Sequence, residues 1–508
     1  MTEGDETRSN ASPFGGKAIL PCVLALSMSL SGCFLPNVGR PDAVPDVPEA
    51  YREASKGKSD AALPQLDWWR GFKSPELTAL IEEAQTANLD IAAATARITQ
   101  ADAQARIAGA ALLPMVDGNA DFTHSRRSLT TSGGTSNTGI GRREGNLYSL
   151  SLSASYEVDF WGKNRALLEA ARDSAVASRY AREVIALSTV ASVANTYFLV
   201  LASQDRLNNA RENVRAATRI LDLIRERLQA GTTSGLEVAQ QEALVAQQRA
   251  LIPTYTQTVE QNKAVLAVLV GRPPERVNIR GGSARKIAIP RVTPGLPSEL
   301  LTQRPDIREA EANLAGADAN VYAARAAFLP SIQLTGQDGW QSAILRSLIR
   351  PESAFFSLAA SITQPIFDAG TLLGNLEQQK GRQEELLQTY RKTVIQAFSD
   401  VDQALIAVKQ QTEFERLQTR VVEASRRAFE ISETRLREGT VDLVTVLQTQ
   451  QTLYQAVDAL VQARLARLQA IVSLYQALGG GWPPTNAEIA AATGGYVWSG
   501  IPVPAPKE

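Results

Sequence analysis

The clearest pattern in the chain is a strict alternation of apolar and polar side chains over residues 148–160. The apolar positions are Tyr148, Leu150, Leu152, Ala154, Tyr156, Val158 and Phe160, and the polar positions between them are Ser149, Ser151, Ser153, Ser155, Glu157 and Asp159. Because successive side chains of a strand point to opposite faces, this segment predicts a β-strand with one apolar and one polar face. Weaker alternation predicts three more strands, over residues 116–125, 331–337 and 356–363.

The four predicted strands form two pairs, each joined by a polar connection, residues 126–145 in the first pair and 338–353 in the second. Strands of about ten residues have the length needed to cross a bilayer in a β-barrel. Tyr148, Phe160 and Trp161 lie near strand ends, where membrane barrels carry aromatic side chains. A half-buried soluble sandwich would show the same alternation, so the strands alone leave both folds open.

A helical segment of unusual length follows each pair of strands. Residues 163–230 contain no proline, and one continuous helix over this length would extend about 100 Å. In the second half, Val394, Phe398, Val401, Leu405 and Val408 recur about every 3.5 residues, a spacing typical of coiled coils. Globular domains seldom contain helices this long. A tube of antiparallel helices does, and we expect such a tube here.

Gly231 and Gly439 are predicted to end the two long helices, because glycine readily adopts the left-handed conformation of a helix C-terminal cap. A second helix then begins in each half. Ser234 followed by Glu237 is typical of a capping box, and Asp442 stands where an N-cap is expected. Each half of the chain therefore predicts a helical hairpin.

The chain contains two copies of one unit. The segment from Arg227 to Thr232 recurs 208 positions later as the segment from Arg435 to Thr440. A second set of matches, at a shift of 216 positions, includes the helix-breaking prolines Pro114 and Pro330. A period of about 210 residues is too long for a solenoid and implies two structurally equivalent halves.

The N-terminus carries a predicted lipoprotein signal. An apolar run over residues 18–30, too short to span a bilayer, ends in Leu30-Ser31-Gly32-Cys33 and resembles a bacterial lipobox. Cleavage there would leave Cys33 as the acylated first residue of the mature chain, and several acyl chains hold a protein firmly to a membrane. Phe34 rather than aspartate follows the cysteine, which favours the outer membrane by resemblance to lipoprotein sorting rules.

Composition excludes several classes of function. The 52 basic and 53 acidic residues are intermixed and give a formal net charge of −1, so no basic field is available and nucleic acid is excluded as a partner. His124 is the only histidine, and Cys22 and Cys33 are the only cysteines. No phosphate loop, nucleophile motif or metal-ligand spacing occurs, so we expect neither an enzyme nor a cofactor or metal.

Four strands cannot stand alone in lipid, because an open sheet leaves its edge hydrogen-bonding groups unsatisfied in hydrocarbon. The chain must therefore assemble if its strands cross a membrane. Two copies would close a narrow barrel of about eight strands, and three copies a barrel of about twelve strands, wide enough to conduct. The serine-rich face of the strands then lines water.

Several segments resemble the TolC family of outer-membrane factors. They are Pro297-Ser298-Glu299-Leu300-Leu301, Arg304-Pro305-Asp306-Ile307-Arg308, Ala310-Glu311, Ala326-Ala327-Phe328-Leu329-Pro330, Tyr156-Glu157-Val158-Asp159-Phe160-Trp161-Gly162 and the two RLxxGT turns. The resemblance covers residues 64–482 and is strongest to the lipoprotein branch that serves proton-driven RND-type efflux pumps. It implies an α+β membrane protein, a trimeric 12-stranded β-barrel with four strands per chain, continued by a long periplasmic α-helical barrel.

The predicted domain organisation combines these features. It comprises a lipoprotein signal peptide (residues 1–32), an N-terminal extended linker (33–63), a first structural repeat (64–270), an inter-repeat linker (271–296), a second structural repeat (297–482) and a C-terminal tail (483–508). Each repeat corresponds to one outer-membrane efflux protein unit.

The resemblance also implies functional residues at the helical turns. The family closes its tunnel with inward acidic side chains near the start of the second helix of the second hairpin, but the matching positions here hold Thr445 and Gln448. Asp442 is the nearest carboxylate and in threefold symmetry would supply one acidic ring, with helix capping as the competing role. The turns that meet the adaptor in the family correspond to Arg227, Leu228, Gly231, Thr232, Arg435, Leu436, Gly439 and Thr440.

The sequence and its resemblance together predict the outer-membrane channel of a tripartite efflux system, anchored by lipid at Cys33 and extending into the periplasm. The expected partners are two further copies of the chain in a homotrimer, a periplasmic adaptor (membrane fusion) protein, an inner-membrane RND-type pump and outer-membrane lipid. The channel would passively conduct small toxic compounds or drugs. A periplasmic lipid-anchored coiled-coil scaffold without a pore is the alternative.

Overall fold

The computed structural model describes residues 67–126, 144–290, 292, 300–301 and 303–480 of the 508-residue chain. Cys33 and the predicted signal peptide lie outside these residues. The described chain divides into two compact units. The first unit contains residues 104–171 and 316–384, and the second contains the remaining described residues.

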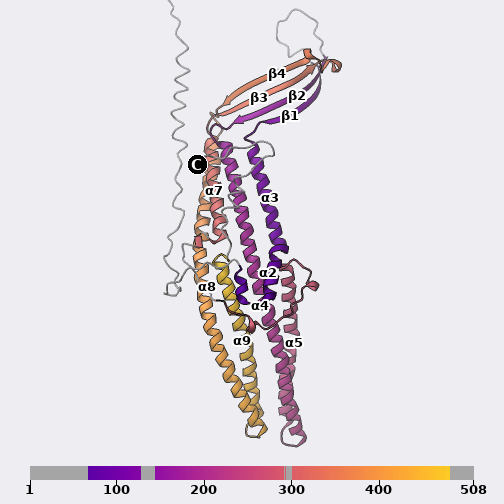
Figure 1. The fold of residues 1–508 in the computed structure, drawn as a ribbon, viewed down its shortest axis with the longest axis vertical. Coiled ribbons are helices and arrows are strands. Elements are labelled where there is room, and N and C mark those ends of the chain that lie inside the picture. The colour runs from indigo at the N-terminus through magenta and orange to yellow at the C-terminus, as the bar shows by residue number, and fades with distance from the viewer. Residues whose placement is uncertain (1–66, 127–143, 291, 293–299, 302, 481–508) are drawn as a thin grey trace, which may run out of the picture. The chain divides into compact units, whose positions relative to one another are not determined.

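The first unit is built on a four-stranded antiparallel sheet in the order β1-β2-β3-β4 (Figure 1). The strands are β1 (Met115–Arg126), β2 (Glu144–Val158), β3 (Ser331–Ser342) and β4 (Ala354–Thr363). All four predicted strands are confirmed. The pairing of β2 with β3 joins the two copies of the repeat into one sheet, a connection that the sequence did not indicate.

Several strand ends differ from the prediction. β2 begins at Glu144 rather than at Tyr148, so it includes the last residues of the connection predicted over 126–145. β3 continues to Ser342, so the connection after it does not begin at residue 338 as predicted. The alternation fades there because Asp338 falls on the apolar face and Gly339 has no side chain; an added Cβ at Gly339 would collide with the Leu150 carbonyl. β2 ends at Val158 rather than at Phe160, because the Asp159 carboxylate accepts hydrogen bonds from two backbone N–H groups at the start of the next helix.

The register places most of the polar side chains of the four strands on one face, with Asp338 and His124 among the exceptions. One row across the sheet runs Asp117, Ser153, Gln337 and Ser357. Side-chain hydrogen bonds link neighbouring strands on this face, from Asn119 Nδ2 to Ser153 Oγ at 3.0 Å and from Gln337 Nε2 to Ser151 Oγ at 3.1 Å. The opposite face carries exposed apolar side chains such as Leu152, Phe356 and Leu358.

The helices repeat with the period found in the sequence. α4 (Lys163–Gln229) and α8 (Thr371–Arg437) each contain 67 residues and begin 208 positions apart. α5 (Gly235–Leu269) and α9 (Leu443–Ala477) each contain 35 residues and also begin 208 positions apart. α3 (Leu89–Ala110) and α7 (Pro305–Ala326) each contain 22 residues and begin 216 positions apart. The two copies therefore share one backbone plan, including both predicted helical hairpins.

The core of the second unit gathers around aromatic side chains that precede the first repeat helices. Trp68 lies in a short 3-10 helix (η1, Trp68–Phe72) and stacks on Tyr475 of α9 with ring centroids 4.6 Å apart. Phe72 meets Phe198 of α4 edge-on at 5.0 Å. Residues of α2 (Pro75–Ala87) complete the cluster. α4 contains a stretch long and apolar enough to cross a bilayer, and 50% of that stretch is buried inside the chain. Several of its apolar side chains, such as Phe198, belong to this core.

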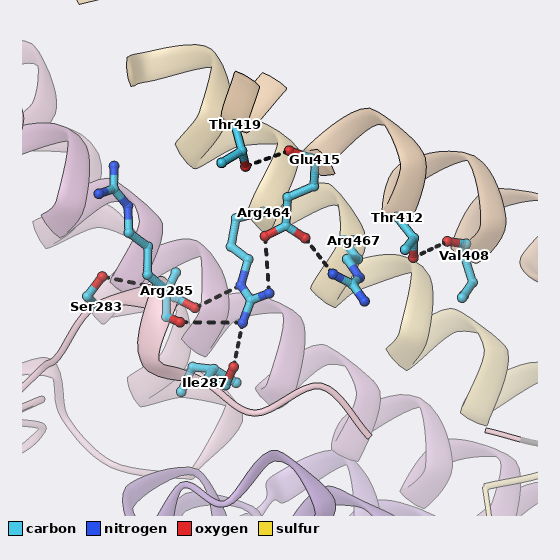
Figure 2. A network of polar contacts seen from close by, with 10 residues as sticks. Ser283, Arg285, Ile287, Val408, Thr412, Glu415, Thr419, Arg464 and Arg467 are labelled. Carbon is cyan, nitrogen blue, oxygen red and sulfur yellow. Dashed lines mark hydrogen bonds and ion pairs between the residues drawn. The ribbon is translucent and has the colours of Figure 1, made fainter. Parts of the chain in front are cut away.

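The segment between the repeats is tied to the helices by a network of ionic contacts (Figure 2). The Arg464 guanidinium, on α9, donates to the carbonyl oxygens of Ala284 at 3.2 Å and Ile287 at 2.5 Å. It also pairs with Glu415 of α8 at 3.1 Å, and the second Glu415 oxygen pairs with Arg467 at 2.8 Å. The Arg464 side chain is only 11% exposed, so its charge depends on these acceptors.

Replacing Arg464 with alanine is expected to lower the free energy of unfolding by about 3 kcal/mol, because it leaves the largely buried carboxylate of Glu415 and two buried carbonyls short of a donor. Arg467→Ala is the matched control: Arg467 contacts only Glu415 in this network, and its loss leaves Arg464 in place, so about 1 kcal/mol is expected. Guanidinium titrations followed by circular dichroism would measure both losses. Equal losses would show that Arg464 does not hold the inter-repeat segment.

Candidate functional site

The turns of the two helical hairpins lie against one another in the second unit (Figure 1). One turn joins α4 to α5 and the other joins α8 to α9. Ile220 and Ile224 of α4 pack against Leu436, Leu443 and Val446 of the second hairpin. Of the twelve site positions proposed from the sequence, eight belong to these two turns, three lie near the start of α9 and one is Cys33. We call the two turns together the tip.

Both turns have the same backbone geometry. Gly231 and Gly439 each have a φ of +73°. Residues other than glycine adopt this left-handed backbone conformation only at a cost in conformational energy. The Gly231 N–H donates to the Leu228 carbonyl at 3.0 Å, and the Thr232 N–H donates to the Arg227 carbonyl at 2.9 Å. The second turn repeats this pattern between Arg435 and Thr440. These are the paired hydrogen bonds of a Schellman cap, so the predicted C-terminal caps are present.

The two helices that leave the turns are capped differently. Ser234 and Glu237 form a capping box at the start of α5, with the Ser234 N–H 3.1 Å from Glu237 Oε2. At the equivalent start of α9, Asp442 Oδ1 accepts a hydrogen bond from the Thr445 N–H at 2.9 Å. Hydrogen bonds from Thr445, first from its hydroxyl and then from its backbone, hold the pKa of Asp442 below its usual range. The Asp442 cap is therefore ionised at neutral pH.

Asp442, Thr445 and Gln448 are all exposed and follow one another at intervals of three residues along α9. Side chains at this spacing lie on one side of a helix. The structure brings Asp442 and Thr445 into contact, and places Gln448 one turn further along without a recorded bond to either. A carboxylate, a hydroxyl and an amide thus form one polar stripe at the end of the second hairpin.

A polar contact at the tip joins the first copy to the second. The Arg227 guanidinium, at the end of α4, donates to the carbonyl oxygens of Leu436 and Arg437, the latter at 3.0 Å. These carbonyls belong to the last turn of α8, and the Leu436 carbonyl also accepts the Gly439 N–H of the helix cap. A cation is favoured at this end of a helix, because the carbonyl groups give it a partial negative charge.

A second contact between the copies was not predicted. Arg206 of α4 pairs with Asp458 of α9, with Nε to Oδ1 at 2.6 Å, and its guanidinium lies 4.6 Å from the centre of the Tyr255 ring. Burial by itself lowers the pKa of Arg206, but the hydrogen bond to Asp458, the charge of Asp458 and the contact with Tyr255 together raise this pKa above its usual value. Tyr454 of α9 also reaches α4, donating to the Asn213 carbonyl at 3.0 Å. No local sequence pattern marks these pairs, which are more than 200 positions apart.

The described residues contain no group of three or more His, Cys, Asp or Glu side chains placed to hold a metal ion. His124 lies exposed on β1, with Nδ1 2.7 Å from Asn146 Oδ1 on β2. It is therefore part of a cross-strand surface pair.

The sequence matches known proteins over most of its length. A family model described as outer membrane efflux protein matches residues 80–272 and 296–480. The pyoverdine export outer membrane protein OpmQ of Pseudomonas putida is 39% identical over 461 residues, covering 91% of this chain and 97% of that protein. OpmQ of Pseudomonas aeruginosa is 41% identical, covering 86% and 91%. The toluene efflux pump outer membrane protein TtgC of Pseudomonas putida is 33% identical, covering 89% and 93%.

Solved structures agree with the fold described above. The outer-membrane channel OprN superposes with a TM-score of 0.81 at 27% identity and covers 89% of this chain and 100% of its own. The open state of the MtrE outer membrane channel of Neisseria gonorrhoeae gives 0.77 at 31% identity, covering 86% and 97%. The predicted α+β fold class and the predicted outer-membrane location are confirmed. The chain belongs to the outer membrane efflux protein family, the TolC family of outer-membrane channels.

Proposed function

We propose that this chain is the outer-membrane channel of a tripartite efflux system and that it acts as a conduit, without enzymatic activity. Three copies close a 12-stranded barrel whose polar face surrounds water. The proposal is carried by the sheet, which has one polar face, one exposed apolar face and two outer strands. Family membership supports the same arrangement.

The apolar face of the sheet is suited to lipid. Phe356 is 77% exposed, Leu358 is 83% exposed and Leu152 is 59% exposed in the single chain. Exposed apolar surface of this extent is unfavourable in water but favourable against hydrocarbon. The row from Asp117 through Ser153 and Gln337 to Ser357 then faces the lumen, where it offers hydrogen bonds to passing solutes without binding any one of them tightly.

The proposed partners are two further copies of this chain, a periplasmic adaptor, an inner-membrane RND-type pump and outer-membrane lipid. The tip is the proposed contact with the adaptor, through residues of both turns. These residues are Arg227, Leu228, Gly231, Thr232, Arg435, Leu436, Gly439 and Thr440. Each of the two repeats, residues 64–270 and 297–482, contributes one helical turn. A trimer would therefore present six such turns to the adaptor.

The proposed cargo is a class of small toxic compounds or drugs. Relatives at 33% identity are named for the efflux of toluene and antibiotics, and those at 39% and 41% are named for pyoverdine export. The higher identity favours pyoverdine-like compounds as a second cargo class. Both classes are compatible with a passive conduit lined by hydroxyl and amide groups.

Native mass spectrometry of the detergent-purified protein is expected to give three chains per particle, because four strands per chain close a barrel of about twelve strands only in threes. The same preparation is expected to form conducting pores in planar bilayers. A stable monomer that does not conduct would contradict the channel and would favour a lipid-anchored periplasmic scaffold.

Replacing Cys33 with serine is expected to abolish lipid attachment, because acylation requires the thiol. Labelling of cells with a radioactive fatty acid would measure this loss. Cys22→Ser is the matched control, since Cys22 leaves with the proposed signal peptide and its replacement should keep the label on the mature chain. Label retained by Cys33→Ser would exclude Cys33 as the anchor.

Asp442, Thr445 and Gln448 are the proposed periplasmic gate. In a trimer, Asp442 would give one ring of three carboxylates, while Thr445 and Gln448 occupy the positions where the family carries an acidic pair. Because the Asp442 pKa is lowered, the ring is charged at neutral pH and attracts cations, an effect that salt weakens.

Planar-bilayer recordings are expected to show a cation preference that is present at neutral pH and disappears as the pH falls below the usual aspartate range. The sign follows from the lowered pKa: protonation, and with it loss of the charge, requires a pH below the ordinary value. Asp442→Asn keeps a capping oxygen but carries no charge, so its selectivity should be lower and independent of pH in this range. Unchanged selectivity in a trimeric variant would leave Asp442 as a cap only.

A further inference from the structure

The two copies differ in one contact at the tip. The Arg227 guanidinium donates hydrogen bonds to the last carbonyl oxygens of α8, as described above. Arg435 stands at the equivalent position in the second copy, 208 residues later, at the end of an equally long helix. Its side chain is exposed, and within the described part of the chain it has no hydrogen-bond or ionic partner. The same structural unit thus carries a paired arginine in one copy and an unpaired one in the other.

We propose that Arg435 of each subunit donates to the carbonyl oxygens of Leu228 and Gln229 in the next subunit, the partners that correspond to Leu436 and Arg437. This inference rests on the proposed trimer. In a ring of three duplicated chains, the first copy faces the second copy of its own chain, and the second copy faces the first copy of the neighbouring chain. The Arg227 contact within the chain then corresponds to an Arg435 contact between chains.

The acceptor side of the proposed contact is available. Leu228 and Gln229 end α4 just as Leu436 and Arg437 end α8, with the same Schellman cap behind them. The Leu228 carbonyl accepts the Gly231 N–H, as the Leu436 carbonyl accepts the Gly439 N–H. A carbonyl oxygen has two lone pairs, and the Leu436 carbonyl already uses both, since it also accepts from Arg227. The second lone pair of Leu228 is the corresponding free site.

The side chain of Leu228 gives an independent indication. Leu436 is 3% exposed because Ile220 and Ile224 of the first copy cover it. Leu228, its equivalent, is 41% exposed in the single chain. The positions equivalent to the two isoleucines are Ala428, which is exposed, and Ser432, which is buried against Thr449 of its own hairpin, so only Ala428 would approach Leu228 from the next subunit. The proposed contact surface between subunits has fewer apolar groups than the contact surface within the chain. The arginine contact therefore contributes a larger share of its stability.

Pairs of cysteines at exposed positions would test the adjacency. Gln229→Cys with Arg435→Cys spans the proposed contact between subunits, and Arg227→Cys with Arg437→Cys spans the known contact within the chain. After treatment with a short bis-maleimide, the first pair is expected to shift the chain from the monomer to covalent dimers and trimers on a denaturing gel. The second pair should remain at the size of one chain. The unmodified chain, treated alike, controls for Cys22 and Cys33.

Native mass spectrometry of the same samples separates the possible failures. Trimers in which the first pair gives only monomeric bands would overturn the contact and leave the channel proposal standing. A preparation that is not trimeric would overturn both.

The hydrogen bond itself is tested by charge removal. Arg435→Gln is expected to lower the temperature at which the trimer dissociates into monomers on a denaturing gel. Arg437→Gln removes a nearby arginine that pairs only with Glu433 of its own helix, so it should leave that temperature unchanged. Equal dissociation temperatures for Arg435→Gln and the unmodified trimer would show that Arg435 does not bind the neighbouring helix end.

Discussion

The hydrogen-bonding groups on the outer sides of β1 and β4 are the constraint on which the rest of the architecture depends. Within the described sheet, β1 neighbours only β2 and β4 neighbours only β3. In hydrocarbon each unsatisfied backbone group costs several kcal/mol, so a membrane-spanning sheet must close on itself. Four strands are too few to close, and the missing neighbours have to come from other copies. Association of subunits is therefore a condition of insertion into the membrane.

Duplication of one unit supplies the four strands that each chain brings to the barrel. Equal helix lengths and constant shifts of 208 and 216 positions show that both copies retain the same backbone plan, down to the positive φ angles of Gly231 and Gly439. The side chains between the copies have diverged instead. Arg206 and Asp458 bind one another, but the positions equivalent to them are Phe414 and Ala250. In the proposed trimer, the contact between chains would therefore differ in chemistry from the contact within the chain.

The parts of the structure that the sequence predicted are those set by local periodicity. Alternation identified all four strands, the lack of proline and the regular apolar spacing identified α4 and α8, and glycine and capping residues located the turns. The pairing of β2 with β3, the bonds of Arg464 to the inter-repeat segment and the Arg206 to Asp458 pair join residues far apart in the chain. Such contacts leave no periodic signal. β3 was underestimated for a related reason, since Asp338 and Gly339 interrupt its pattern while the ladder with β2 continues.

Capping and gating at Asp442 do not compete for the same property of the side chain. One carboxylate oxygen accepts the Thr445 N–H, and hydrogen bonding of this kind stabilises the ionised form, which is why the pKa is lowered. The cap therefore secures the charge that a gate would use. It also fixes the carboxylate at the first turn of α9, whereas Thr445 and Gln448 lie further along the same side with no charge. In the proposed gate, Asp442 would supply one ring of carboxylates close to the turn. The electrostatic barrier of such a gate would be shorter than that of a gate with acidic residues on two successive turns.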